Sequence, residues 1–201
     1  MKKPIFLCLL SASMITSTQA QNSISYQEAL DICKQRLEEK HKENPDIFPY
    51  VGPDCIIGAQ VPEFTATTMD GSVITPEYFR GKVTILNFWM ISCPPCIAEI
   101  PGFNHIRETY GNDQLHYVAI TPDNEKDVKH FLNNNPWKFE QILSGFDIIF
   151  DIFNSRWGYP TTLVVNQEGV IIDAFSGGRT DQNAVKDLED RLTVSIQNAL
   201  K

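Results

Sequence analysis

The stretch from Val83 to Pro101, VTILNFWMISCPPCIAEIP, constrains the fold of this chain more than any other. It opens with a short run of β-branched and aromatic residues, which predicts a buried strand. Two prolines follow Cys93, and proline in a first turn is typical of a helix start, because the first N–H groups there need no partner within the helix. The sequence therefore predicts a strand that leads into a helix, with Cys93 and Cys96 at the junction.

Two cysteines separated by two residues at such a junction favour redox chemistry. A thiolate at a helix N-terminus faces free N–H groups and the positive end of the helix dipole, which lowers its pKa and favours attack on disulfides. Half of a zinc site and a plain structural disulfide are the alternatives. The four histidines are scattered and none pairs with a second cysteine cluster, so we predict no metal site.

The N-terminus has the pattern of an export signal. Two lysines precede an apolar run from Ile5 to Ile15, and small and polar residues continue to Ala20. This pattern predicts a secretory signal peptide over residues 1–20, because the apolar run is too short to span a membrane. We therefore expect an exported, periplasmic protein that has no stable membrane insertion after the signal is removed.

Charge excludes some partners. The chain of 201 residues has a formal net charge of −8, and removal of residues 1–20 takes away two lysines and no acid, which gives −10. An acidic surface repels phosphate groups, so nucleic acid and anionic membrane surfaces are poor candidates. The length suits one domain with additions.

Residues 21–56 are predicted to form an N-terminal helical extension. Ser25 to Asn44 reads as a helix, and Cys33 lies on its apolar face. Without the signal peptide four cysteines remain, an even number in an oxidising compartment. That count favours a structural Cys33–Cys55 disulfide over two independent buried thiols.

Residues 57–201 alternate between strand and helix patterns and then finish with a hairpin and a helix, which predicts an α/β fold with a mixed sheet flanked by helices. The site is expected at the end of a central strand. The other predicted elements are an Asp-Gly hairpin (Phe64–Thr68 and Ser72–Ile74), a short helix from Thr75, strands Leu115–Thr121 and Phe139–Leu143, helices Asn124–Asn133 and Phe150–Arg156, a hairpin (Thr161–Val165 and Val170–Phe175), and a last helix capped by Thr180 or Asp181.

From about Ile57 to the C-terminus the chain resembles the thioredoxin superfamily, and more closely its exported branch of TlpA- and ResA-like thiol-disulfide oxidoreductases. The resemblance is carried by Asn87-Phe88-Trp89, Cys93-Pro94-Pro95-Cys96, Glu99 with Pro101, and Gly158-Tyr159-Pro160-Thr161-Thr162. It implies a thioredoxin-like fold with Pro160 as a cis-proline opposite the dithiol. It also implies an enzyme without a cofactor that exchanges disulfides with protein partners, in the reductase direction, supplied by a membrane thiol donor.

The resemblance also implies roles for single residues. Cys93 is expected to be the exposed attacking thiolate and Cys96 the resolving thiol. Trp89, Ser92, Tyr159 and Pro160 are expected to border the substrate. Ser92 stands where thioredoxins usually carry tryptophan, and Tyr159 is bulkier than the usual residue, so both bear on the choice of partner.

Two points stay open at this stage. Glu99 matches the glutamate that follows the second cysteine by three residues in ResA-like proteins. It is expected either to carry protons for Cys96 or to be an ordinary carboxylate on the helix surface. The alternative function is a copper-binding chaperone of the same fold that holds Cu(I) with Cys93 and Cys96.

Overall fold

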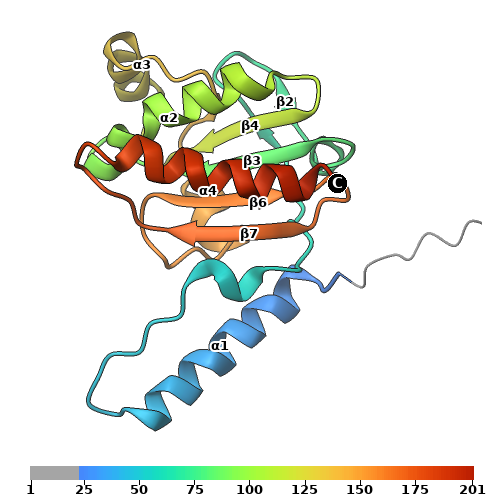
Figure 1. The fold of residues 1–201 in the computed structure, drawn as a ribbon, viewed down its shortest axis with the longest axis vertical. Coiled ribbons are helices and arrows are strands. Elements are labelled where there is room, and N and C mark those ends of the chain that lie inside the picture. Colours follow the sequence, from blue (N-terminus) through green and yellow to red (C-terminus); the bar gives the residue numbers. More distant parts are fainter. Residues whose placement is uncertain (1–22) are drawn as a thin grey trace, which may run out of the picture.

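The structure is a computed structural model that describes residues 23–201, so the predicted signal peptide lies outside the described residues. A five-stranded mixed sheet with the order β5-β4-β3-β6-β7 confirms the predicted α/β class (Figure 1). β3 pairs in parallel with β4, and β4 with β5, whereas β6 runs antiparallel to both β3 and β7. The strands are β3 (Val83–Phe88), β4 (Leu115–Ile120), β5 (Glu140–Ile142), β6 (Thr161–Val165) and β7 (Ile171–Ser176).

One face of the sheet is covered by α2 (Pro94–Tyr110) and α4 (Ala184–Ala199), which cross in front of it in Figure 1. All six residues of the central strand β3 are buried. Ile85 packs in the cluster on the α2 and α4 side, whereas Leu86 and Phe88 pack in the cluster on the other side. Burial on both faces explains why this strand reads as a nearly continuous apolar run.

The opposite face is covered by segments from three parts of the chain. Tyr26, Phe64 and Phe153 meet there. The ring centroid of Phe153 lies 5.6 Å from that of Tyr26 and 5.6 Å from that of Phe64, and the Tyr26 hydroxyl donates a hydrogen bond to the Phe153 carbonyl. The start of the N-terminal extension is therefore part of the domain core. The elements on or beside this face are α1 (Tyr26–Glu43), the short helices η1 (Pro53–Ile56), η2 (Pro76–Phe79) and η3 (Ile148–Ile152), and the hairpin of β1 (Ala66–Thr67) and β2 (Val73–Ile74).

Two predicted helix positions are wrong. The last helix begins at Ala184, because the Asp181 side chain binds Arg179 and the Asn183 N–H in a turn that precedes it. The helix expected over Phe150–Arg156 lies earlier, at η3, which buries Ile149 beneath the sheet. Helix α3 (Glu125–Asn134) and the two hairpins lie within two residues of the predicted bounds.

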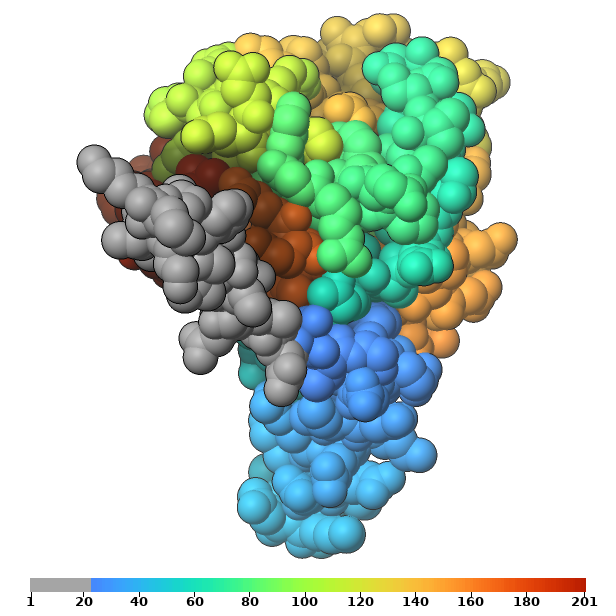
Figure 2. Space-filling model, turned by 90° about the vertical axis from the view of Figure 1, so that its right-hand side faces the viewer, coloured from blue at the N-terminus to red at the C-terminus, as the bar shows by residue number. Residues whose placement is uncertain are grey.

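Helix α1 stands out from the domain. Ser25 and Glu28 form a capping box at its start, and only Tyr26 and Ala29 are buried along its length. The expected apolar face is therefore covered only near its N-terminal end, and Leu37 is 38% exposed. Figure 2 shows the helix as a blue protrusion beneath the body of the molecule. Within residues 23–201 no helix has the length and apolar character needed to cross a bilayer.

A disulfide joins this helix to η1. The sulfur atoms of Cys33 and Cys55 are bonded, and the two Cα atoms lie 5.3 Å apart, in the usual range for a disulfide. The bond closes a sequence separation of 22 residues. It holds α1 at the point where the helix leaves the core.

We predict that Cys33→Ser combined with Cys55→Ser lowers the free energy of unfolding by about 3 kcal/mol, because the open chain gains loop entropy in the unfolded state. Thermal unfolding of the double variant against the wild-type chain measures this loss. Exchange activity at Cys93 and Cys96 should remain. Free thiols at both positions in protein from its native compartment would contradict the prediction.

Candidate active site

The two cysteines of the motif lie at the start of α2. Cys93 is the N-cap residue, and its Sγ accepts a hydrogen bond of 3.2 Å from the Cys96 N–H. Pro94 and Pro95 have no N–H group, so the N–H of Cys96 is the first one that the helix offers. The sulfur occupies the place that a serine or aspartate oxygen usually takes in a cap. A negative charge on this sulfur would be stabilised by that bond and by the helix dipole.

Cys93 and Cys96 are bonded to each other, with an S–S distance of 2.03 Å. Cys93 is 6% exposed and Cys96 is 1% exposed. Cys93 is thus the more accessible of the two, as expected, but it is far less exposed than the sequence suggested. A partner must approach closely to reach its sulfur.

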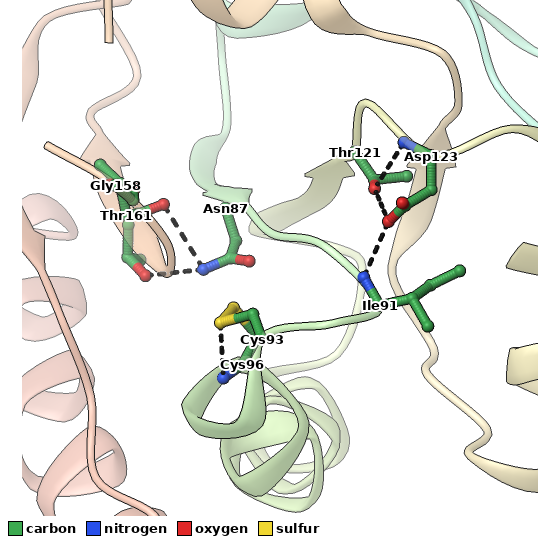
Figure 3. The surroundings of a disulfide bond; sticks show 9 residues. Asn87, Ile91, Cys93, Cys96, Thr121, Asp123, Gly158 and Thr161 are labelled. Atoms are coloured by element: carbon green, nitrogen blue, oxygen red, sulfur yellow. Dashed lines mark hydrogen bonds between the residues drawn. A yellow bond between two sulfur atoms is a disulfide. The ribbon is translucent and has the colours of Figure 1, made fainter. Parts of the chain in front are cut away.

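Asp123 holds the loop that precedes Cys93. Its carboxylate accepts a hydrogen bond of 2.7 Å from the Ile91 N–H and another of 2.8 Å from the Thr121 hydroxyl (Figure 3). Sequence reasoning gave this residue no role. Its position in the sequence could have indicated a role, because it lies just beyond the carboxyl end of β4, the strand next to β3. The carboxyl ends of neighbouring parallel strands meet at one edge of a sheet.

The loop before β6 lies on the other side of the disulfide (Figure 3). The Tyr159–Pro160 peptide bond is cis, and Pro160 is buried. Thr161 is paired with Phe88, which places Pro160 beside the end of the motif strand. Asn87 points from β3 toward this loop and donates a hydrogen bond of 2.9 Å to the Thr162 hydroxyl.

The residues expected to border the substrate differ in exposure. Ser92 is exposed beside Cys93, and Tyr159 is partly exposed. The Tyr159 hydroxyl is buried without a hydrogen-bond partner among residues 23–201, and its pKa is raised by burial and by the nearby Asp123 charge. Both residues lie where a partner can touch them.

Trp89 does not border the substrate, so that prediction is wrong. Its side chain is fully buried and packs at 5.0 Å from Trp137, measured between ring centroids. Its indole N–H donates a hydrogen bond to Gln141 on β5. Trp89 still belongs to the apolar surface of the sheet, and it supports the motif loop from beneath.

Glu99 is buried, so the alternative of a solvated surface carboxylate is wrong. It is 4% exposed, and its Oε2 atom has no hydrogen-bond partner among the described residues. Burial raises its pKa to about 8. It lies one helical turn after Cys96, on the same side of α2. Its carboxyl group lines a pocket of about 200 Å³ beside the segment that follows β7.

Gly178 lets the Glu99 carboxyl take this position. A Cβ atom at Gly178 would overlap Glu99 Oε1 and would lie 3.2 Å from the Cβ of Pro95. The neighbouring Gly177 N–H donates a hydrogen bond of 2.9 Å to the Pro160 carbonyl. This glycine pair therefore links the cis-proline loop to the first turns of α2, and sequence reasoning missed it.

We predict that Gly178→Ala pushes the Glu99 carboxyl toward water, so that its pKa falls from about 8 toward the ordinary value of 4.5. The pH–rate profile of disulfide exchange should then move to lower pH. In a Glu99→Gln background the same glycine change should leave the profile where it was, which tests the coupling of the two positions. An equal shift in both backgrounds would contradict this role.

In the part of the chain that the structure describes, no group of three or more histidine, cysteine or acidic side chains is placed to hold a metal ion.

Comparison with known proteins places the chain in a family. A model of the AhpC/TSA family matches residues 57–174, more than half of the chain. The chain belongs to this family. The AhpC/TSA match begins just after Cys55, so α1 and the Cys33–Cys55 disulfide lie outside it.

Relatives agree with the predicted resemblance. The chain is 29% identical over 141 residues to the thioredoxin-like protein YneN of Bacillus subtilis, which covers 67% of this chain and 78% of that protein. It is 30% identical over 132 residues to the thiol-disulfide oxidoreductase ResA of Bacillus thuringiensis subsp. konkukian, covering 63% and 73% respectively. The predicted ResA-like branch is therefore confirmed.

Solved structures confirm the predicted thioredoxin-like fold. The thioredoxin domain of a thiol-disulfide oxidoreductase from Bacteroides vulgatus superposes with a TM-score of 0.58 at 22% identity, covering 70% of this chain and 97% of that domain.

Proposed function

We propose that the chain is a thiol-disulfide oxidoreductase that exchanges disulfides with protein partners through Cys93 and Cys96. The observation that carries the proposal is the Cys93–Cys96 disulfide at the N-terminus of α2. The Cys93 sulfur accepts a hydrogen bond from the Cys96 N–H, and the Pro160 loop lies beside the disulfide. Such exchange is also the activity that the names of the relatives give.

The first step begins from the reduced chain. The Cys93 thiolate attacks one sulfur of a partner disulfide, which forms a Cys93–partner bond and releases the other partner sulfur as a thiolate. Cys93 is suited to this role because it is the more accessible sulfur and because the Cys96 N–H points at it. Cys96 is enclosed, and among residues 23–201 no N–H group donates a hydrogen bond to its sulfur.

The second step releases the partner. The Cys96 thiol loses its proton, and the resulting thiolate attacks Cys93 Sγ. The partner leaves as its second thiolate, so two electrons have passed to it and the Cys93–Cys96 disulfide has formed. Glu99 takes the proton: a carboxyl group with a pKa of about 8 is matched to a thiol, whose ordinary pKa is about 8.5.

The reductase direction is tested by the reduction potential. We expect the Cys93–Cys96 pair to lie near roughly −270 mV, as in thioredoxin, when it is equilibrated with dithiothreitol buffers. A value near roughly −120 mV, as in DsbA, would overturn the reductase direction and make the chain an oxidant. Release of thiols from a model disulfide tests the exchange activity itself.

We infer the compartment from residues 1–20. Two lysines, an apolar run and small residues up to Ala20 support export to the periplasm, and an exported reductase needs a thiol donor at the membrane to restore its dithiol. The mass of the mature protein from its native compartment tests this. A mature chain that keeps residues 1–20 would contradict it.

A further inference from the structure

The outer half of α1 and the segment that returns from it carry exposed apolar side chains. Phe48 is 94% exposed, Ile47 is 62% exposed and Tyr50 is 58% exposed. Large apolar side chains gathered in this way are typical of binding surfaces rather than of solvated loops.

These side chains border an apolar groove. Its inner part, of about 390 Å³, lies between α1, residues 48–51 and the loop that contains Arg156 and Trp157. Its outer part, of about 440 Å³, is lined by Ile47 among others, and both parts share Leu37, Phe48 and Pro49. We call this feature the arm groove. Its inner part has the volume of a pocket that receives one or two large side chains.

One disulfide and two hydrogen bonds fix the walls of the arm groove. The Cys33–Cys55 disulfide joins α1 to η1, and the Lys40 ammonium group donates a hydrogen bond of 2.8 Å to the Tyr50 carbonyl. The hydroxyl groups of Tyr50 and Ser176 share a hydrogen bond of 2.8 Å. A surface fixed in advance loses less conformational entropy when it binds.

The inner end of the groove is linked to the cis-proline loop through the end of β7. Ser176, which binds Tyr50, is paired with Thr161, the residue after the cis-proline. The next residue, Gly177, donates to the Pro160 carbonyl, and Trp157 lies three residues before Pro160. A polypeptide whose cysteine is bound at Cys93 would therefore reach the arm groove by passing the cis-proline loop and the end of β7.

Charge indicates what the groove binds. Lys34 and Arg156 line its inner part, and among residues 23–201 no acidic side chain does, although the chain carries a net charge of −8. Neither cation forms an ion pair with a described residue. The outer part is lined by Glu38 as well as by apolar side chains, so the basic character belongs to the inner part. A basic, apolar pocket on an acidic protein is complementary to an apolar segment that also carries carboxylates.

We propose that the arm groove binds the polypeptide that brings its disulfide to Cys93, by receiving an extended apolar and acidic segment next to the partner's cysteine. The inference rests on the proposed disulfide exchange and adds a specificity site to it. A partner with such a segment is selected by the groove, and a small disulfide is not.

The test uses the reduced full chain and two synthetic peptides, each carrying one cysteine as a mixed disulfide with thionitrobenzoate. In one peptide the cysteine is followed by an extended segment of phenylalanine, leucine and aspartate, and in the other by glycine and serine. Attack by Cys93 releases the coloured thiolate. We expect the second-order rate constant of this single reaction to be about tenfold higher for the apolar, acidic peptide, a ratio that one well-placed apolar contact supplies.

Phe48→Ser and Lys34→Glu should each remove most of that preference, and the effect of Lys34→Glu should shrink at high salt. Both side chains are exposed, so folding is preserved. Val194→Ser is the matched control, because Val194 is 59% exposed on α4, away from the groove. All variants should react with the small disulfide 5,5′-dithiobis(2-nitrobenzoate) at the wild-type rate.

Wild-type peptide kinetics in Phe48→Ser and Lys34→Glu would overturn the groove while leaving the proposed function intact. Failure of the wild-type chain to react with the small disulfide would instead overturn the proposed function. Sedimentation tests whether the groove instead binds a second copy of the chain. If the wild-type chain is a dimer, Phe48→Ser dissociates it and the peptide preference does not change, the groove binds a second copy and the inference is overturned.

Discussion

Cys93→Ser will abolish disulfide exchange, whereas Cys96→Ser will leave a chain that captures its partners as stable mixed disulfides. The serine hydroxyl is not ionised near neutral pH, so Cys93→Ser should lower the rate by a factor on the order of 10³ or more. Cys96→Ser keeps the sulfur that caps α2 but lacks the thiol that would release the partner. Nonreducing electrophoresis and mass analysis measure the trapped species.

The reactivity of the two thiols provides the control. In the reduced wild-type chain, Cys93 should react first with an alkylating agent, because Cys96 is 1% exposed and lies within the first turn of the helix. The double variant Cys33→Ser with Cys55→Ser is the matched control, because it also removes two cysteines but leaves Cys93 and Cys96 in place. First alkylation at Cys96 would reverse the assigned roles.

Glu99→Gln will change both the pH dependence of exchange and the pH dependence of stability. In the wild-type chain the resolving step should quicken as pH rises through about 8, where Glu99 becomes a carboxylate that can accept the Cys96 proton. Glutamine fills the same space and cannot accept it. The resolving step should then follow only the ionisation of Cys96 itself, with a rate loss of about 10²-fold near pH 8.

The free energy of unfolding should change with pH in the opposite direction to the exchange rate. The folded chain holds the Glu99 proton up to a pH of about 8, whereas the unfolded chain releases it near 4.5, so wild-type stability falls as pH rises between these values. Each pKa unit is worth about 1.4 kcal/mol, which makes the full loss roughly 4 to 5 kcal/mol above pH 8. Glu99→Gln has no carboxyl group to ionise at this position, so it does not lose this stability and should be the more stable chain at pH 9.

Urea unfolding at pH 5 and pH 9 measures this difference for the oxidised proteins. Glu43→Gln is a suitable control, because Glu43 is an exposed carboxylate that forms no ion pair with a described residue. Identical pH–rate profiles for the wild type and Glu99→Gln would remove Glu99 from the mechanism. Equal stability of both chains at pH 9 would show that the carboxyl group is not held in an apolar setting.

Local pattern predicted most of the fold. The apolar run Val83–Phe88 became the central strand, and the prolines after Cys93 mark the start of α2. Both features are local properties of the sequence. The two prolines cannot donate backbone hydrogen bonds, and a continuous apolar run is buried on both faces only in the middle of a covered sheet. The cysteine spacing was enough to indicate the chemistry, because both sulfurs come from the cap and first turn of one helix.

Tertiary structure decided which side chains face the site. Trp89 follows the strand directly, yet it points into the core, and Glu99 could have been on either side of its helix. Asp123 and Gly178 act on the motif from more than 25 and more than 75 residues away, so no local pattern contains them. Burial, which sets the pKa of Glu99, depends on the segment after β7 that packs against it, and a sequence read along one segment does not record that contact.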